Sequence, residues 1–195
     1  MFGADRRVEA NVNPFALPIG LKGRLAGWYM GLPDAQHWEL ASKTSVEHNN
    51  RLVEVGFGPG QLVEMLHDRV PTLVLAGVDP SEIMVRRARR RNPCADFQVG
   101  AAAAMPFPDG QTDLVISVNN VPMWPDLDAG LVEIRRVLRP GGRVMIAWHG
   151  GHDPRGHQRR LMLQPDRKAE IDAAVRRRFP DVRIMMLQHS DVWET

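Results

Sequence analysis

Three closely spaced glycines form the part of the sequence best suited to hold a ligand. Gly56, Gly58 and Gly60 lie between an apolar run ending RLVEV and a helical pattern beginning QLVEML. Glycine has no Cβ and accepts positive φ, so a ligand can lie against this backbone, and the N–H groups at the start of the following helix attract a negatively charged part of that ligand. The turn is therefore a candidate binding loop.

An acidic residue at the end of the next apolar run gives the loop a partner. Asp79 follows LVLAGV about 20 residues after the glycines, and its two oxygens can accept hydrogen bonds from both hydroxyls of a ribose. The dinucleotide pattern G-x-G-x-x-G would require a glycine where Gln61 stands, which disfavours a nicotinamide oxidoreductase. The pattern is instead E-x-G-x-G-x-G, from Glu54 to Gly60.

A histidine after the last apolar run of the central region is the candidate for proton transfer. His149 follows RVMIAW, and an imidazole, with an ordinary pKa near ~6.5, suits a general base. A loop histidine that only bonds its neighbours or faces water is the alternative. His152 and His157 follow, but no carboxylate or cysteine stands at ligand spacing, so we predict no metal site.

These residues need a scaffold, and the pattern around them indicates alternating strands and helices. Five short, nearly continuous apolar runs predict buried parallel strands at residues 51–55, 72–78, 95–99, 112–118 and 142–148. Apolar residues at helical spacing predict crossover helices at residues 61–69, 81–91 and 127–138. The fold class is therefore α/β, Rossmann-like and doubly wound, with a mostly parallel sheet.

Helical patterns at residues 17–30 and 35–49 precede the first strand. We expect residues 1–50 to form an N-terminal helical appendage on the substrate side, and residues 51–195 to form the main domain. After the fifth strand, helical patterns flank Pro165 and one convincing strand follows at residues 182–188.

Four segments of the chain carry a family resemblance: VEVGFGPG, GVDPSEIM, AMPFPDGQTDLVIS and EIRRVLRPGGRVMIAW. In their order and spacing the chain resembles the class I S-adenosylmethionine-dependent methyltransferases, in the small methyltransferase-domain group that includes ubiquinone-biosynthesis-like enzymes. The resemblance implies S-adenosyl-L-methionine as cofactor, S-adenosyl-L-homocysteine as product, and methyl transfer by in-line displacement, in which alignment replaces a covalent intermediate.

The resemblance also maps the family's cofactor site onto this chain. It implies that Glu54 orients the methionine amino group and that Asp79 holds the ribose hydroxyls. Pro80 and Met84 match positions beside the adenine, and Asn119 falls near the methionine end. The predicted cofactor residues are Glu54, Gly56, Phe57, Gly58, Gly60, Asp79, Pro80, Met84, Ala101, Ala102 and Asn119.

The chain departs from the family pattern at two places. Similar enzymes often carry a G-D-A sequence whose aspartate accepts a bond from the adenine amino group, whereas this chain has Gly100, Ala101 and Ala102. Losing such a bond costs about 1.5–3 kcal/mol, although the Ala102 N–H can still bind adenine. The family sheet also ends in an antiparallel strand pair, and one strand after residue 180 predicts a shortened C-terminal edge, which leaves a homodimer open.

The acceptor has no signature of its own. Trp124 and Trp148 follow or end predicted strands near the site, and Trp28, Tyr29 and Trp38 lie in the predicted N-terminal helices; such aromatic walls favour a small-molecule acceptor, unless they only pack the fold. Arginine clusters, within a net charge of only +2, keep RNA methylation as an alternative. A non-catalytic, cofactor-binding partner subunit is the third hypothesis.

Composition bounds the remaining function classes. No run approaches the ~20 apolar residues of a membrane span, and the first residues lack the apolar stretch of a secretory signal, so we expect a cytoplasmic protein. Cys94 is the only cysteine among 195 residues, which excludes an intrachain disulfide.

Overall fold

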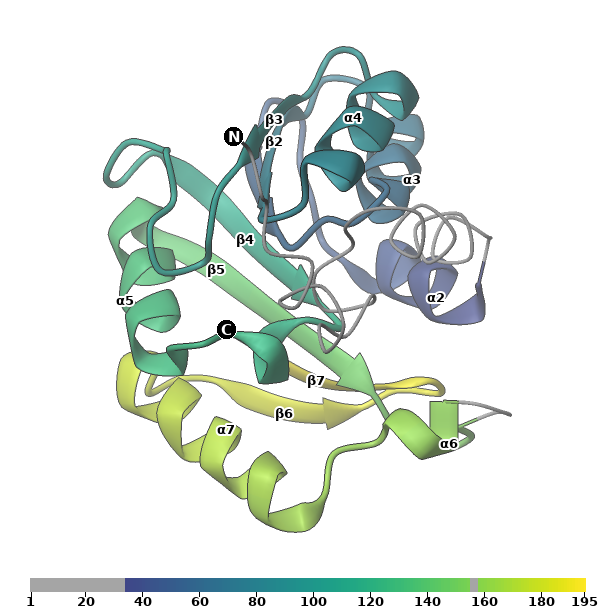
Figure 1. Ribbon diagram of the computed structural model, residues 1–195, viewed down its shortest axis with the longest axis vertical. Coiled ribbons are helices and arrows are strands. Elements are labelled where there is room, and N and C mark those ends of the chain that lie inside the picture. Colours follow the sequence, from purple (N-terminus) through teal and green to yellow (C-terminus); the bar gives the residue numbers. More distant parts are fainter. Residues whose placement is uncertain (1–33, 155–157) are drawn as a thin grey trace, which may run out of the picture.

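The computed structural model describes residues 34–154 and 158–195, and Figure 1 shows a central twisted sheet flanked by helices. The strand order is β3-β2-β1-β4-β5-β7-β6. The first five strands pair in parallel, and β7 is antiparallel to both β5 and β6. The strands are β1 Arg51–Val55, β2 Val74–Asp79, β3 Asp96–Val99, β4 Thr112–Val118, β5 Leu138–His149, β6 Arg183–Met186 and β7 Ser190–Glu194.

The helices cover both faces of this sheet, which confirms the predicted α/β, doubly wound, mostly parallel fold. Side chains of α2, α3 and α4 pack with one set of alternate strand residues, such as Leu52 and Ile116. Side chains of α5 and α7 pack with the other set, such as Val53 and Val115. The helical elements are α2 Ala35–Lys43, α3 Gln61–Arg69, α4 Glu82–Arg91, η2 Val121–Met123, α5 Leu127–Val137, α6 Gln158–Leu161 and α7 Pro165–Arg178.

The direction of the chain reverses around β1, and this positions the site. The chain passes from β1 outward to β2 and β3, then returns to β4 on the other side of β1. The strand order reverses between β1 and β4, and in open α/β sheets ligands bind at the carboxyl ends of the strands at such a point. The glycine loop follows β1 at this point.

The predicted shortened C-terminal edge is wrong. β7 lies between β5 and β6 and pairs Trp193 with Ile146. Its sequence, SDVWE, lacks the apolar run expected of a buried strand. Ser190 and Asp191 are nevertheless buried, because they form polar contacts with Gln36 and Lys168, respectively. With β5 covered by β7, the reason for expecting a partner strand beside β5 disappears.

The predicted helix at residues 35–49 is too long. α2 ends at Lys43, where the Arg69 guanidinium donates hydrogen bonds to the carbonyls of Ala41 and Thr44 and so satisfies the end of the helix. β5 begins at Leu138, earlier than predicted, and includes the PGG segment. The predicted helix at residues 17–30 lies outside the described residues, and the division of the chain at residue 50 stays a prediction.

Candidate active site

The glycine loop turns sharply from β1 into α3. Gly56, Gly58 and Gly60 have φ of 71°, 53° and 79°, a left-handed conformation that favours glycine. A Cβ on Gly56 would lie 2.4 Å from Nδ2 of Asn120, so a side chain there cannot fit without displacing that residue. The loop therefore both turns sharply and packs closely against Asn120.

Asn120 joins this loop to the end of β4. Its Nδ2 donates to the carbonyls of Val55 at 2.7 Å and Val118 at 3.1 Å. Its Oδ1 accepts from the Ser117 hydroxyl at 2.9 Å and from the Trp124 indole N–H at 2.7 Å. Sequence reasoning missed Asn120; the adjacent pair of asparagines after a buried strand was the only signal.

Glu54 is a buried carboxyl group below the loop. It is 3% exposed, and no donor from the described residues reaches its Oε2. Burial, and then the charge of Asp79, raise the pKa of Glu54 to about 8. A buried carboxyl group with an unsatisfied oxygen fits a ligand cation, as the α-ammonium of a methionine would be.

Asp79 ends β2 opposite the loop. Its Oδ2 accepts from the N–H of Gly58 at 2.9 Å, and its Oδ1 accepts from the N–H of Ser81 at 2.8 Å. Burial raises the pKa of Asp79 to about 6, against the lowering effect of the two N–H donors. Since each carboxylate oxygen has a second lone pair, Asp79 can still accept hydroxyl donors while it fixes the loop.

The remaining predicted cofactor residues differ in what they offer. The Phe57 ring packs on Phe97 in the core with centroids 4.4 Å apart, so only its backbone belongs to the loop surface. Pro80 is exposed, whereas Met84 is fully buried in the first turn of α4. The turn with exposed Ala101 and half-buried Ala102, closed by an Ala101 to Ala104 bridge, follows β3. These contacts with adenine stay predictions.

Asn119, at the carboxyl end of β4, has a left-handed backbone with φ of 57°. Its side chain exchanges hydrogen bonds with Gln36 of α2: Nδ2 donates to Oε1 of Gln36 at 2.8 Å, and Oδ1 accepts from Nε2 at 3.3 Å. Gln36 gave no signal in the sequence. The described part of the N-terminal segment thus reaches the predicted methionine end of the site.

His149 ends β5 and is half-buried beside the Trp148 indole, with ring centroids 5.6 Å apart. β5 lies between β4 and β7, so His149 is close in the sheet to Asn119 and pairs with Ser190. His152 is exposed in the following loop, and His157 lies outside the described residues. No three residues of the described chain are grouped as metal ligands.

Two tryptophans flank the carboxyl ends of β4 and β5, as expected. Trp124 follows η2 and packs against Gly130, and Trp148 donates from Nε1 to the carbonyl of Leu161 at 2.6 Å. Both are half-buried. Trp38 is 62% exposed on α2, and Trp28 and Tyr29 lie outside the described residues.

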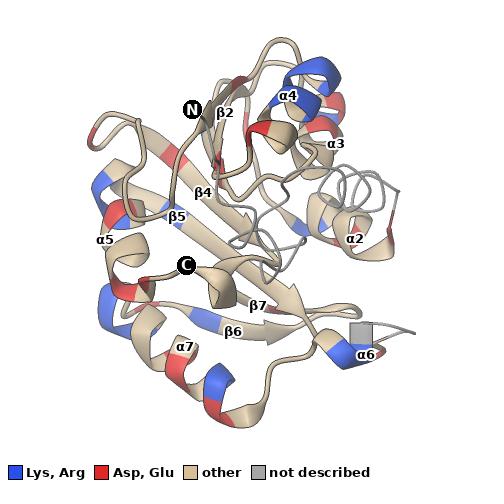
Figure 2. Ribbon diagram, viewed as in Figure 1, with Lys and Arg blue, Asp and Glu red and all other residues tan. Residues whose placement is uncertain are grey.

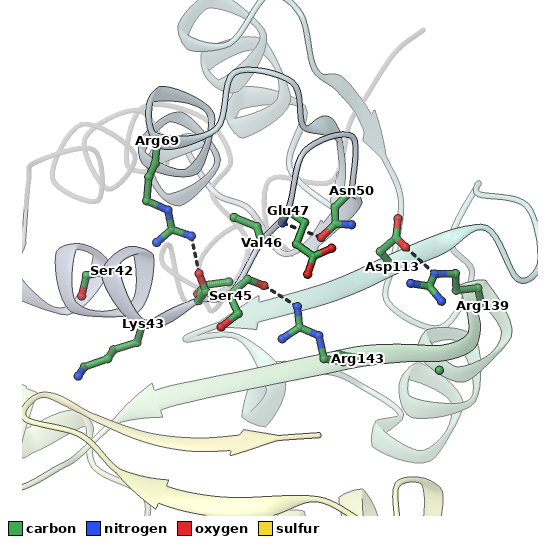
Figure 3. A pocket seen from close by; sticks show the side chains of 12 residues that line it. Ser42, Lys43, Ser45, Val46, Glu47, Asn50, Arg69, Asp113, Arg139 and Arg143 are labelled. Carbon is green, nitrogen blue, oxygen red and sulfur yellow. Dashed lines mark hydrogen bonds and ion pairs between the residues drawn. The ribbon is translucent and has the colours of Figure 1, made fainter.

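The other ends of the parallel strands, at which the strands begin, form the amino edge of the sheet. This edge has a cleft of about 540 Å³, lined by residues from α2, the loop between α2 and β1, the end of α3 and the starts of β4 and β5 (Figure 3). Its arginines are already engaged within the protein. Arg69 and Arg143 donate to backbone carbonyls, and Arg139 pairs with Asp113. We therefore assign the site to the carboxyl ends of the parallel strands, which form the carboxyl edge of the sheet. The polar groups there can still accept hydrogen bonds.

Comparison with known proteins identifies the family of the chain. The family model described as a methyltransferase domain matches residues 53–146, which contain the loop, Asp79 and Asn119. The chain is 32% identical over 126 residues to the uncharacterised methyltransferase YdaC of Bacillus subtilis (strain 168), covering 63% of this chain and 69% of that protein. This chain is a class I S-adenosylmethionine-dependent methyltransferase.

The chain is also similar to a second curated methyltransferase and to a solved methyltransferase structure. It is 30% identical over 160 residues to a trans-aconitate 2-methyltransferase of Methylobacterium nodulans, covering 80% of this chain and 60% of that enzyme. The crystal structure of a SAM-dependent methyltransferase from Aquifex aeolicus superposes with a TM-score of 0.71 over 88% of this chain and 96% of that one, at 14% identity. The methyltransferase spans less than half the length of several other curated relatives.

Membership of this family implies S-adenosylmethionine as the cofactor, and the residues at the site are chemically compatible with it. The buried Glu54 with an open oxygen suits the cofactor's ammonium, and Asp79 keeps acceptor capacity for its ribose. No helix among the described residues is long and apolar enough to cross a membrane.

Proposed function

We propose that this methyltransferase acts on a small-molecule acceptor held over the carboxyl ends of β4 and β5. The cofactor side of this proposal rests on the buried Glu54, whose Oε2 faces no donor of the described chain beside a loop of left-handed glycines. Such a group is costly unless a ligand completes it. Its position beside Asp79 matches the two polar ends of the cofactor's methionine and ribose.

The bound cofactor supplies a methyl group on a sulfonium that leaves as a neutral thioether. The chain's own residues then have to bind and orient. Glu54 holds the ammonium, Asp79 holds the ribose hydroxyls while fixing Gly58, and Asn119 forms the wall beside the methionine. Alignment of this kind can contribute about 7–11 kcal/mol towards lowering a barrier, with no nucleophilic side chain required.

His149 is the proposed base for acceptors that must lose a proton. It lies at the carboxyl end of β5, next to β4 in the sheet, and is only half-buried, so it can both receive a proton and release it to solvent. For an acceptor that is already an anion, such as a carboxylate, His149 would serve only to orient it.

The distribution of charge supports a small molecule over RNA. Figure 2 shows the basic segment of α4 apart from those of α5 and α7, which pack on the other face of the sheet. Several of these arginines pair with acidic neighbours on their own helices, such as Arg86 with Glu82 and Arg176 with Asp172. A nucleic acid would require a connected basic surface. The relative named for trans-aconitate also supports a small acceptor.

Calorimetry and turnover together test the proposal. We expect S-adenosylhomocysteine to bind the wild-type chain, and a panel of small acids, phenols and amines incubated with methyl-labelled cofactor to yield a methylated product. Absence of cofactor binding at millimolar concentration would contradict the cofactor site. Binding without turnover on any small acceptor, together with salt-sensitive turnover on RNA, would favour the RNA alternative.

A further inference from the structure

Gln36, in the first turn of α2, is a fully buried polar side chain. Its amide makes three hydrogen bonds to residues far away in the sequence. Two are with the Asn119 side chain, at 2.8 and 3.3 Å, and the third goes from Nε2 to the Ser190 hydroxyl at 3.1 Å. The side chain thus connects the ends of β4 and β7 to the N-terminal segment.

The topology places this amide over the end of β5. Asn119 follows β4 and Ser190 begins β7, and β5 lies between these two strands. A side chain that reaches both must cross the carboxyl end of β5, where His149 is paired with Ser190. Residues alternate between faces along a strand, so His149 points to the same face as Ala147, the face that α2 covers. Gln36 therefore lies at the junction of the proposed cofactor and acceptor sites.

Asn119 needs support in its present conformation. A left-handed backbone is uncommon outside glycine, although asparagine tolerates it better than most residues. Without partners, its half-buried side chain could also take other rotamers or exchange the positions of its oxygen and nitrogen. The paired bonds to Gln36 fix both the rotamer and the orientation of the Asn119 amide.

We propose that Gln36 is a positioning residue, which holds Asn119 ready to contact the methionine end of S-adenosylmethionine. The inference rests on the proposed function, because it assigns Asn119 to that end of the site. Gln36 acts through Asn119, so α2 contributes to cofactor affinity.

The attachment of α2 does not depend on Gln36, which separates positioning from folding. Glu39 on the same helix accepts from the N–H groups of Gln188 at 2.7 Å and His189 at 2.9 Å. Leu40 and Ala41 are buried in the core against the sheet. The helix thus keeps its polar and apolar anchors when Gln36 is replaced.

The first test compares variants by calorimetry with S-adenosylhomocysteine and by thermal unfolding. Gln36→Met keeps the length of the side chain but removes its hydrogen bonds, and we expect about ten-fold weaker binding, the effect of about one lost hydrogen bond. Ser190→Ala removes the other partner of Gln36, and Glu39→Gln weakens the helix anchor. Both controls should lower the unfolding temperature while leaving the Kd within about two-fold of wild type.

A double-mutant cycle gives the decisive readout. If Gln36 acts through Asn119, then Gln36→Met should have no further effect on the Kd in an Asn119→Ala background. An equal weakening in both backgrounds, or an unchanged Kd in Gln36→Met alone, would overturn the proposal. If Gln36→Met does not fold, Gln36→Leu, which also removes the hydrogen bonds without burying a charge, replaces it in the cycle. Failure of the wild-type chain to bind would instead contradict the proposed function itself.

Discussion

Two aspartates at opposite edges of the sheet have pKa values shifted in opposite directions. At the carboxyl edge, burial raises the pKa of Asp79 to about 6 in spite of two backbone donors. At the amino edge, burial also acts on Asp113, but the Arg51 N–H and the Arg139 guanidinium outweigh it and lower the pKa of that carboxyl. At the carboxyl edge, no cation of the described residues therefore pairs with Asp79, whereas at the amino edge Arg139 pairs with Asp113.

The same contrast extends to the surrounding residues. The carboxyl edge carries Glu54, whose Oε2 has no donor within residues 34–154 and 158–195, and Asn119 with a left-handed backbone, both of which are unfavourable without a ligand. The amino edge carries arginines that bond backbone carbonyls around its cleft (Figure 3). We therefore expect the binding site where buried polar groups lack partners among the described residues, rather than at the amino edge, where the charged groups are paired.

The largest effect should come from Asp79→Asn. The substitution removes the charge that accepts the ribose hydroxyls, and its Nδ2 would face a backbone N–H of Gly58 or Ser81. We expect about 100-fold weaker binding of S-adenosylhomocysteine, equivalent to about 3 kcal/mol, measured by calorimetry. The unfolding temperature should also fall, because one backbone N–H loses its acceptor, but the chain should remain folded at the temperature of the calorimetry. An unchanged affinity would refute the role of Asp79 in binding and, with it, the inference that the carboxyl edge holds the cofactor.

Glu54→Gln should separate stability from binding through its pH dependence. Because the folded pKa of Glu54 is raised to about 8 from 4.5, its favourable contribution to folding is present below pH 4.5 and is lost as pH rises through 8. The variant cannot ionise, so its unfolding temperature should fall less than that of the wild type between pH 5 and 8. It should nevertheless bind cofactor roughly ten-fold more weakly at pH 8, because it cannot pair with the ammonium.

Thermal unfolding of the wild type and of Glu54→Gln over this pH range checks the first expectation, and calorimetry at pH 8 checks the second. Asp79 titrates near 6 in the same cluster, so the difference between the two proteins, rather than either curve, isolates Glu54. If the unfolding temperatures of the two proteins changed with pH in parallel, the pKa of Glu54 would not be raised by folding.

Ala101→Asp should strengthen binding. It restores the carboxylate with which similar enzymes accept the adenine amino group, in an exposed turn after β3. We expect roughly ten-fold tighter binding of S-adenosylhomocysteine, one charge-assisted hydrogen bond gained in a partly solvated position. Ala103→Asp adds the same charge to the same exposed turn and serves as the control. Equal changes in both variants would indicate a general electrostatic effect instead of an adenine contact.

The sequence predicted the features of this site that depend on neighbouring residues, and it did not predict those that depend on residues far apart in the chain. The loop, Asp79 and the five parallel strands depend on local patterns of apolar runs and turns, and they lie where they were expected. Gln36 and Asn120 act through contacts 83 and 65 residues away, which no local pattern records. β7 was missed for the same reason, because its inward Ser190 and Asp191 are compatible with burial only after their distant partners are in place.

The smallest effect on binding should come from the amino edge. Asp113→Asn removes the charge that pairs with the half-exposed Arg139 but keeps an acceptor for the Arg51 N–H, at 2.7 Å in the wild type. Surface pairs of this kind contribute at most about 1 kcal/mol, so the unfolding temperature should fall by roughly 2–4 °C. Because the pKa of Asp113 is lowered in the folded protein, ionised Asp113 stabilises the fold at pH values above the usual pKa of an aspartate. The difference in unfolding temperature between wild type and variant should therefore vanish as pH falls through the lowered pKa of Asp113. The Kd for S-adenosylhomocysteine should stay within about two-fold of wild type, since the residue lies at the far end of β4; a larger change would mean that the two edges are coupled through that strand.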